Sequence, residues 1–454
     1  MGLVRQVVGR APRGDVLVGA LPAVALGVGV TGATTFVGLV LMDRVSILVE
    51  LLVLAAVLAM ARRGTSAQPV APFPDPAPRW FRGIAWVALA AVALVGAVVW
   101  VSESLKEVHG SWDAWDFWNM RGRFLLRAGD AWERAFTEIL FWAHPSYPPM
   151  LPSNVARGFH LVGRESLLVP AALSCLFTVA SPLSLGWTVA KLRGRTQGVI
   201  AATTLLAVPY IVLHGADQYA DTPLAFFFLA TWCFIALHDH AEEGRGFLVM
   251  AGLAATLAAL TKNEGIVFFL CVAAGRSWLA LRRGGRSRWW REATAFATGA
   301  LPIGAVVALF KLGYSAMPVT GEFYVGRYAD YWGDTGPVQH VVTQVSDPAR
   351  WEGMAASWWF WLTHFDMSWP VPLLFGLGGY GLLMGWSPRR PRDTTGSMVR
   401  AFGIQIIVVS GLFLAWSTLN IIDHMEALGR LLYQALPAVT LGVFLALRAP
   451  FETE

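Results

Sequence analysis

Long apolar runs separated by short polar segments make up most of the chain. Most of these runs approach the roughly 20 residues that a helix needs to cross a hydrocarbon core of about 30 Å. The pattern predicts an all-α, polytopic bundle of about 12 transmembrane helices. The twelve runs are 16–42, 45–61, 83–102, 166–190, 197–214, 222–238, 247–260, 265–281, 293–312, 369–386, 401–419 and 431–448.

The polar segments between the runs predict three parts. Residues 1–63 are an N-terminal pair of spans, 64–82 form a Pro-rich cytoplasmic linker, and 83–448 form the main transmembrane domain. Within it, 103–165 and 313–368 are long outer loops. In 119–142, apolar and charged residues alternate at near-helical spacing, which predicts a helix lying in the membrane interface.

Composition supports a membrane protein. Apolar residues make up 56% of the chain and charged residues 14%, whereas a water-soluble domain has about a quarter of charged residues. Lys and Arg concentrate before the first run and after runs two, four, eight and ten, which predicts a cytoplasmic N-terminus. The net charge of +5 therefore indicates membrane anchoring and not a nucleic-acid partner.

Two carboxylates, Asp113 and Asp116, follow the third run within Ser111–Trp118. Carboxylates three residues apart share a helix face, and they can act as a general base with its helper or hold a cation. The alternative is an aromatic belt with incidental charge. We expect Asp113, ahead of Asp116, to be catalytic.

The same outer segment ends in His144-Pro145-Ser146-Tyr147-Pro148-Pro149. The prolines fix the backbone, so this motif is either a rigid structural turn or a turn that presents His144 and Tyr147 to a substrate. Further along, Asp217 and Asp221 join two runs. Asp221 precedes Thr222-Pro223 and suits a helix N-cap, whereas Asp217 has no such role and is expected to bind substrate.

Lys262 and Glu264 follow the short run 247–260. Residues two apart do not face each other on a helix, although Gly265 indicates a break. A lysine at membrane depth needs an ion-pair partner or an anion, so Lys262 is expected to face an anion and Glu264 to hold it in place.

His424 and Arg430 precede the last run. Arg430 is either an interface anchor or a phosphate contact, because a guanidinium suits bidentate phosphate binding. The segment His238-Asp239-His240 is expected to be a solvated loop. No spacing resembles a zinc site, and Cys175, Cys233 and Cys271 lie within runs without a CxxC pair. No cofactor is expected, with a divalent metal left open.

Together these motifs resemble the GT-C superfamily of glycosyltransferases that use polyprenyl-phosphate sugars, particularly the bacterial aminoarabinose transferases and protein O-mannosyltransferases. The motifs that carry the resemblance are Trp112-Asp113-Ala114-Trp115, His144-Pro145-x-Tyr147-Pro148, Tyr219-Ala220-Asp221-x-Pro223, Leu260–Gly265 and Gly429-Arg430-Leu431-Leu432. The resemblance covers roughly 83–448.

The resemblance implies a membrane enzyme that moves a hexosyl or pentosyl group from a polyprenyl-phosphate donor to a hydroxyl on a glycan, lipid or protein acceptor. Asp113 would be the base, the reaction would invert the anomeric centre, and Lys262 and Arg430 would hold the phosphate. The expected location is the bacterial plasma membrane with an extracytoplasmic active site. Asp113-Ala114-Trp115-Asp116 replaces the adjacent acidic residues of many members, so the choice of base stays open.

Two other classes of protein fit the same pattern. A transporter or lipid flippase is also polytopic, but it would need ionisable residues near mid-membrane, and runs 83–102, 166–190 and 197–214 contain none. A polymerase or ligase of undecaprenyl-linked glycans would share both the chemistry and the membrane face.

Overall fold

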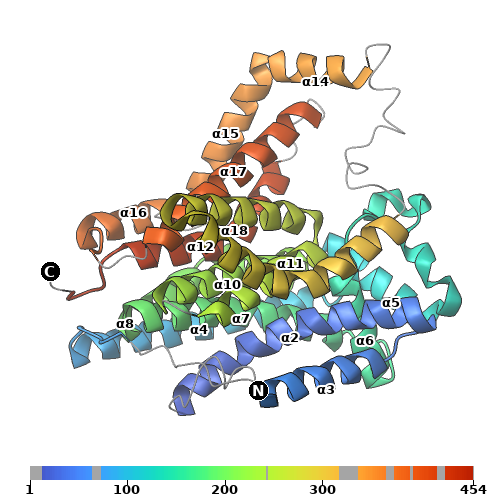
Figure 1. Cartoon of the computed structure of the whole chain (residues 1–454), viewed down its shortest axis with the longest axis horizontal. Helices are drawn as coiled ribbons and strands as arrows, with labels where there is room; N and C mark the ends of the chain where they lie inside the picture. The colour runs from blue at the N-terminus through green and yellow to red at the C-terminus, as the bar shows by residue number, and fades with distance from the viewer. Residues whose placement is uncertain are drawn as a thin grey trace.

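The computed structural model describes residues 13–63, 73–241, 244–315, 336–364, 373–388, 392–416 and 425–452, and this part of the chain is all-helical (Figure 1). The helices up to Ala143 are α2 (Arg13–Met42), α3 (Leu48–Arg63), α4 (Arg79–Lys106), η1 (Ala114–Trp118), α5 (Asn119–Arg127), η2 (Gly129–Phe136) and η3 (Glu138–Ala143). The remaining helices are α6 (Met150–Val162), α7 (Leu168–Arg193), α8 (Arg195–Leu206), α9 (Pro209–Ala216), α10 (Asp221–His240), α11 (Arg245–Thr261), α12 (Asn263–Gly313), α14 (Gly336–Ser346), α15 (Pro348–His364), α16 (Leu373–Met384), α17 (Arg392–Trp416) and α18 (Met425–Ala446).

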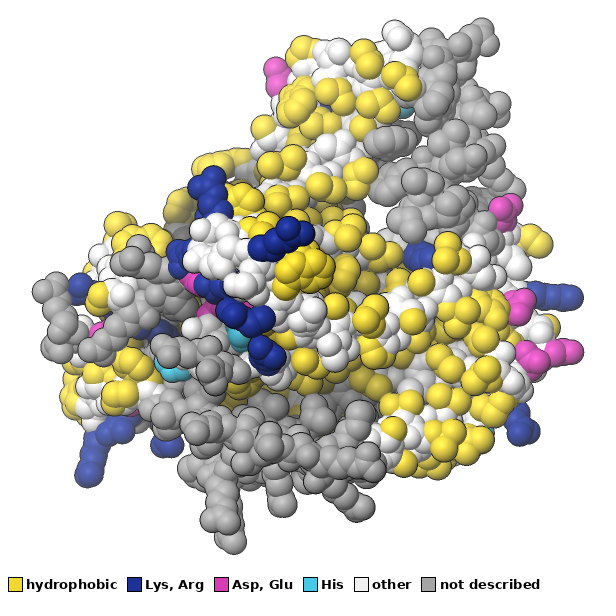
Figure 2. All heavy atoms as spheres, viewed as in Figure 1, with side chains coloured by type: hydrophobic (Ala, Val, Ile, Leu, Met, Phe, Trp, Pro, Cys, Tyr) yellow, Lys and Arg dark blue, Asp and Glu magenta, His cyan; other side chains and the backbone are white. Residues whose placement is uncertain are grey.

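The predicted all-α membrane bundle is confirmed. Within the described ranges, seven helices are long and apolar enough to cross a membrane, or eight if the bent pair α8–α9 counts as one span. The predicted number of about 12 is therefore not confirmed. Apolar side chains cover much of the face shown in Figure 2, as expected for a surface in contact with lipid.

Two predicted elements are interrupted. The run 197–214 is divided into α8 and α9, which meet at 60°, because Pro209 opens α9 and disfavours a helical residue before it. The single interfacial helix predicted for 119–142 is also wrong. Helix α5 ends at Arg127 and the short 3₁₀ segments η2 and η3 follow, with Gly129 in the left-handed region at φ 54°.

Helix α10 is the centre of the bundle. It packs against α7, α11, α12, α17 and α18. In its most apolar 18-residue stretch, 89% of the residues are buried, whereas none are buried in the corresponding stretch of α4. Helix α4 thus lies at the periphery with its apolar side chains available to lipid. The first residue of α10, Asp221, is consequently held inside protein.

Helix α12 is a hairpin of two helical arms. The backbone leaves helical geometry at Gly285, which has φ 65° and ψ −164°. Lys311 near the end donates to Asn263 at the start, with 2.5 Å between Nζ and Oδ1. Both ends of α12 therefore lie together, next to the start of α10.

The N-terminal helices pack onto the rest of the bundle. Helix α2 contacts α6 and α7, and α3 is fixed to α6 by two 2.6 Å hydrogen bonds from Arg157 to Glu50. Only 73–82 of the predicted linker 64–82 lie in the described ranges. The division into 1–63, 64–82 and 83–448 stays a prediction.

Candidate functional site

Asp221 is the centre of a buried polar cluster. Its side chain is fully buried. Oδ1 accepts hydrogen bonds from Lys262 Nζ at 3.1 Å and Gln434 Nε2 at 2.6 Å, and Oδ2 accepts from Arg430 Nη2 at 2.7 Å. The N-cap expectation is wrong, because the N-cap of α10 is Ala220 and no side chain caps the helix. A buried carboxylate instead holds two cations, as burial of charge requires.

Lys262 reaches Asp221 because the chain is extended at this point. Lys262 has φ −148° and ψ 163° and lies between α11 and α12. Its Nζ is also 2.9 Å from Glu264 Oε1, which agrees with the expectation that Glu264 holds Lys262 in place. Burial would lower the pKa of Lys262, but attraction by Asp221 and then Glu264 raises this pKa above its ordinary value. Lys262 therefore remains charged.

Arg430 connects the last helix to the segment between α4 and α5. A single nitrogen, Nη2, donates both to Asp221 and to Asp113 Oδ2, the latter at 2.5 Å. Arg430 Nε is buried and has no hydrogen-bond partner within the described ranges. The guanidinium lies over the Tyr219 ring, 4.7 Å from its centroid. Arg430 thus keeps donor capacity beyond the two carboxylates.

The loop of Asp113 is joined to the turn before α10. Ser111 N donates to Asp217 O at 3.0 Å, and Tyr219 Oη donates to Ser111 Oγ at 3.1 Å. Burial raises the pKa of the Tyr219 phenol, so this hydroxyl keeps its proton. These contacts hold Asp113, which is 8% exposed, beside the Asp221 cluster. Asp116 is half-buried in the π-helical turn η1 that follows.

The predicted turn before α6 also adjoins the cluster. Tyr147 stacks on His144 with ring centroids 5.0 Å apart, and Lys262 Nζ lies 5.2 Å from the centroid of the Tyr147 ring. His144 has φ 50°, a conformation that residues with side chains rarely adopt. Tyr147 therefore contacts the buried lysine directly, and the strained His144 supports it.

Asp217 is paired with a histidine that sequence reasoning did not select. His214 Nδ1 lies 3.0 Å from Asp217 Oδ2, and the His214 ring stacks on Tyr210 at 4.9 Å. His214 also contacts the edges of Tyr219 and Tyr433. Asp217 thus lies beside the cluster as the partner of a buried imidazole. His424 lies outside the described residues.

Two further polar residues were missed. Gln434 follows Arg430 by one helical turn, so the spacing of four residues was the available signal. Lys311 Nζ donates to Ser146 O and Asn263 Oδ1, both at 2.5 Å, but its distance in sequence from the other motifs gave no signal. No group of three or more His, Cys, Asp or Glu side chains in the described ranges is arranged to hold a metal ion.

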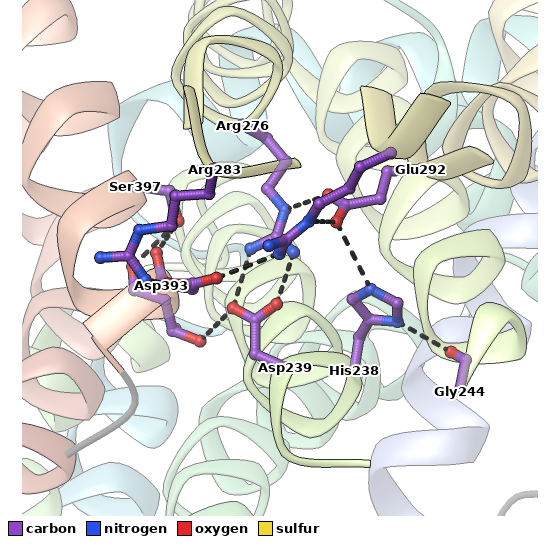
Figure 3. Close-up of polar contacts among 10 residues, drawn as sticks. His238, Asp239, Gly244, Arg276, Arg283, Glu292, Asp393 and Ser397 are labelled. Atoms are coloured by element: carbon purple, nitrogen blue, oxygen red, sulfur yellow. Dashed lines mark hydrogen bonds and ion pairs between the residues drawn. The ribbon is translucent and has the colours of Figure 1, made fainter. Parts of the chain in front are cut away.

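A second polar cluster lies at the other end of α10 (Figure 3). Arg276 donates to both oxygens of Asp239 and, at 2.7 Å, to Glu292 Oε2. Arg288 joins Glu292 to Asp393 on α17, at 2.6 and 3.0 Å. The prediction of a solvated loop at His238-Asp239-His240 is wrong, because the Asp239 side chain is only 4% exposed. This cluster ties α10 and α17 to both arms of α12.

Residues 146–310 match the family model described as dolichyl-phosphate-mannose-protein mannosyltransferase. The matched region is less than half of the chain and contains Tyr147, Asp217, Asp221, Lys262 and Glu264. No match was found among curated proteins or among solved structures. The family match confirms the resemblance expected from the sequence motifs and indicates a glycosyltransferase in a membrane.

Proposed function

We propose that this protein transfers a sugar from a polyprenyl-phosphate donor to an acceptor hydroxyl at the extracytoplasmic face of the membrane. The observation that carries the proposal is the shared pairing of Lys262 and Arg430 with the buried Asp221 carboxylate. Two cations fixed side by side at one end of the bundle suit a lipid phosphate. The family match supplies the class of donor.

The two cations have different tasks in this proposal. Lys262 is 3% exposed and held by Asp221 and Glu264, so it acts as a fixed charge. Arg430 binds both carboxylates through Nη2 alone, leaving Nε for another acceptor. A donor phosphate would compete with Asp113 for this guanidinium. Donor binding would then leave Asp113 with more capacity to accept a proton.

Asp113 is assigned as the general base. It takes the proton of the acceptor hydroxyl as the acceptor oxygen forms a bond to the anomeric carbon. The bond between that carbon and the phosphate oxygen breaks, and its electron pair leaves with the lipid phosphate. Attack opposite the leaving group inverts the centre. Lys262 and Arg430 stabilise the negative charge that develops on the phosphate. Asp116 is assigned as the helper of Asp113.

The extracytoplasmic assignment rests on the two ends of α10. Asp221, with Lys262 and Arg430, is at its start, and the arginine-rich cluster of Asp239 and Arg276 is at its end. Short loops rich in Lys and Arg stay in the cytoplasm, which supports an extracytoplasmic Asp221 end. A cysteine introduced as Asp130→Cys in the first outer loop should react with an impermeant maleimide in intact cells. Reaction only after permeabilisation contradicts the orientation.

The acceptor is assigned to a surface groove of about 490 Å³ beside the Asp113 loop, lined by Trp115, Met120, Arg123, Phe124, Arg127 and Ala128. Trp115 is 43% exposed and lies two residues after Asp113. Exposed aromatic rings provide the flat apolar contact that sugar or lipid acceptors need. In this proposal the acceptor binds in the groove and approaches Asp113 from there.

The decisive assay follows release of polyprenyl phosphate from a panel of polyprenyl-phosphate sugars by the purified protein. Release that depends on an added acceptor and is lost in Asp113→Asn supports the proposal. Asp130→Asn, an exposed carboxylate of the same loop, is the matched control. Release of polyprenyl diphosphate from an added polyprenyl-diphosphate-linked glycan would instead assign a polymerase or ligase, and transport of an intact lipid across vesicles would assign a flippase.

A further inference from the structure

Gln218 has an unusual backbone conformation for a buried residue. It lies between Asp217 and Tyr219 with φ 61°, one of four positive φ values among the described residues other than glycine. Glycine adopts this conformation without strain, whereas a residue with a side chain does so rarely. Strain of this kind is concentrated at functional sites. Gln218 is 3% exposed, so contact with solvent does not explain why a polar residue occupies this position.

The orientation of the Gln218 amide is fixed by Asn119. Asn119 Nδ2 donates to His109 O and to Gln218 Oε1, both at 3.1 Å. Because His109 O is a carbonyl, the Asn119 atom facing it must be the nitrogen, and the Gln218 atom facing Asn119 must be the oxygen. Gln218 Nε2 therefore points away from Asn119. It is buried, with no hydrogen-bond partner in the described part of the chain.

This amide lies where the two halves of the proposed site meet. Asn119 begins α5, immediately after the turn that carries Asp113 and Asp116. The residues on either side of Gln218 are also tied to Ser111, because Asp217 O accepts from Ser111 N and the Tyr219 hydroxyl donates to Ser111 Oγ. The sugar of a bound donor must lie between Asp113 and the phosphate held by Lys262 and Arg430.

We propose that Gln218 is a positioning residue that donates a hydrogen bond from Nε2 to a hydroxyl oxygen of the donor sugar. This inference rests on the proposed function. A neutral amide donor matches a neutral hydroxyl and adds no charge next to the Asp113 carboxylate. A buried donor without a partner is unfavourable, and a sugar oxygen would satisfy it. Gln218 thereby orients the sugar relative to Asp113 and does not take part in proton transfer.

Two variants separate this role from a structural one. Gln218→Glu replaces Nε2 with an oxygen but keeps an oxygen for Asn119 to bind. Gln218→Gly removes the side chain and places at this position a residue that adopts a positive φ without strain. The substitution therefore adds no backbone strain that would lower the melting temperature. The affinities of each variant for polyprenyl-phosphate mannose and for sugar-free polyprenyl phosphate of equal length are measured in detergent at constant ionic strength.

We expect both variants to lose about fivefold or more in affinity for the mannose-bearing lipid, with unchanged affinity for the sugar-free lipid. An unchanged ratio of the two affinities, or an equal loss for both lipids, overturns the inference. Equal affinity of the wild-type protein for the two lipids also overturns it. Failure of the wild-type protein to bind either lipid contradicts the proposed function itself, and the inference falls with it.

Discussion

Arg430 and Asp113 are 317 positions apart in the chain, yet Arg430 Nη2 lies 2.5 Å from Asp113 Oδ2. Neither residue lies within the region that matches the family model. Their contact closes the site from two sides, because Asp113 comes from the segment between α4 and η1 and Arg430 from the last helix. The same guanidinium nitrogen binds Asp221, which lies inside the matched region. The fold thus joins three distant segments at one guanidinium nitrogen.

Asp113→Asn should abolish sugar transfer and leave donor binding intact. Removing a general base typically lowers the rate by about 10²–10⁴, and the asparagine still accepts a hydrogen bond from Arg430. Initial rates of polyprenyl phosphate release are the measurement, with Asp116→Asn compared in parallel. If Asp113→Asn is active and Asp116→Asn is inactive, the two roles are reversed. If both variants are active, neither carboxylate is catalytic and the loop has a structural role.

Lys262→Ala and Arg430→Lys should both weaken binding of sugar-free polyprenyl phosphate. Loss of a charged hydrogen bond costs about 1.5–3 kcal/mol, which corresponds to roughly tenfold to a hundredfold in affinity. Arg430→Lys keeps the charge but loses the planar fork. Binding is measured in detergent at fixed ionic strength, with exposed Arg286→Ala as control. Unchanged affinity in both variants contradicts the assignment of Lys262 and Arg430 as the residues that bind the phosphate.

The affinity for lipid phosphate should not fall between pH 7 and pH 9. Burial opposes the charge, but Asp221 and Glu264 raise the pKa of Lys262 above its ordinary value of 10.5. The charge on Lys262 is fully present below that value and is lost only as pH rises through the raised pKa. A pH titration of binding by the wild-type protein checks this. A loss of affinity with a midpoint below pH 9 contradicts the assigned charge state.

Asp221→Ala should destabilise the protein as well as inactivate it. The variant leaves Lys262 and Arg430 in a buried cluster without their shared counter-ion, and breaking a buried ion pair typically costs about 3–5 kcal/mol. Thermal unfolding in detergent is the measurement. Asp130→Ala at an exposed position of η2 is the control and should melt like the wild-type protein. Normal melting of Asp221→Ala shows that the cluster contributes no net stability.

Arg276→Ala should lower the melting temperature without changing donor affinity. Arg276 holds Asp239 and Glu292 at the opposite end of α10 from the proposed phosphate site (Figure 3). Its loss leaves two carboxylates partly unpaired, again at a cost of about 3–5 kcal/mol. Exposed Arg286→Ala in the same region should have little effect. A lower donor affinity in Arg276→Ala at permissive temperature means that the two ends of α10 are coupled.

Gly299→Ala should destabilise the contact between α11 and α12, whereas Gly304→Ala should not. A Cβ atom at Gly299 would lie 1.7 Å from Val249 O, but one at Gly304 would have only Thr256 Cγ2 nearby, at 3.9 Å. Overpacking typically costs about 1–3 kcal/mol, and alanine favours a helix over glycine by up to about 1 kcal/mol. Melting temperatures of the pair provide the comparison, and equal effects contradict the packing.

The helices could be predicted from sequence where long apolar runs dominate, as at 222–238, which became α10. Predictions failed where contacts with distant helices, and not the neighbouring residues in sequence, determine the position of a side chain. Asp221 has the sequence setting of an N-cap, but two cations from distant helices determine its position. Asp239 is preceded and followed by histidines and reads as solvated, yet Arg276 buries it. Such ion pairs depend on which helices pack together, and the spacing of residues along the chain does not reveal this packing.

The break at α8–α9 was more accessible from sequence. Pro209 lies within the apolar run 197–214 and signals a change of backbone direction, but hydropathy alone passes over it. The pairing of Lys262 with Glu264 was also accessible from sequence. Gly265 indicated a break in the helix, and the extended backbone at Lys262 turns both side chains to the same side.

Helix α10 has 20 residues and therefore spans about 30 Å, close to the thickness of the hydrocarbon core. Asp221 at one end and Asp239 at the other are each fixed by ion pairs to neighbouring helices. The helix can neither tilt nor slide without breaking one of these clusters. The fixed length and position of α10 thus set the depth of the proposed phosphate site in the membrane. Bilayer lipids of unusual length would have to adapt to the protein, and donor access should vary with membrane thickness.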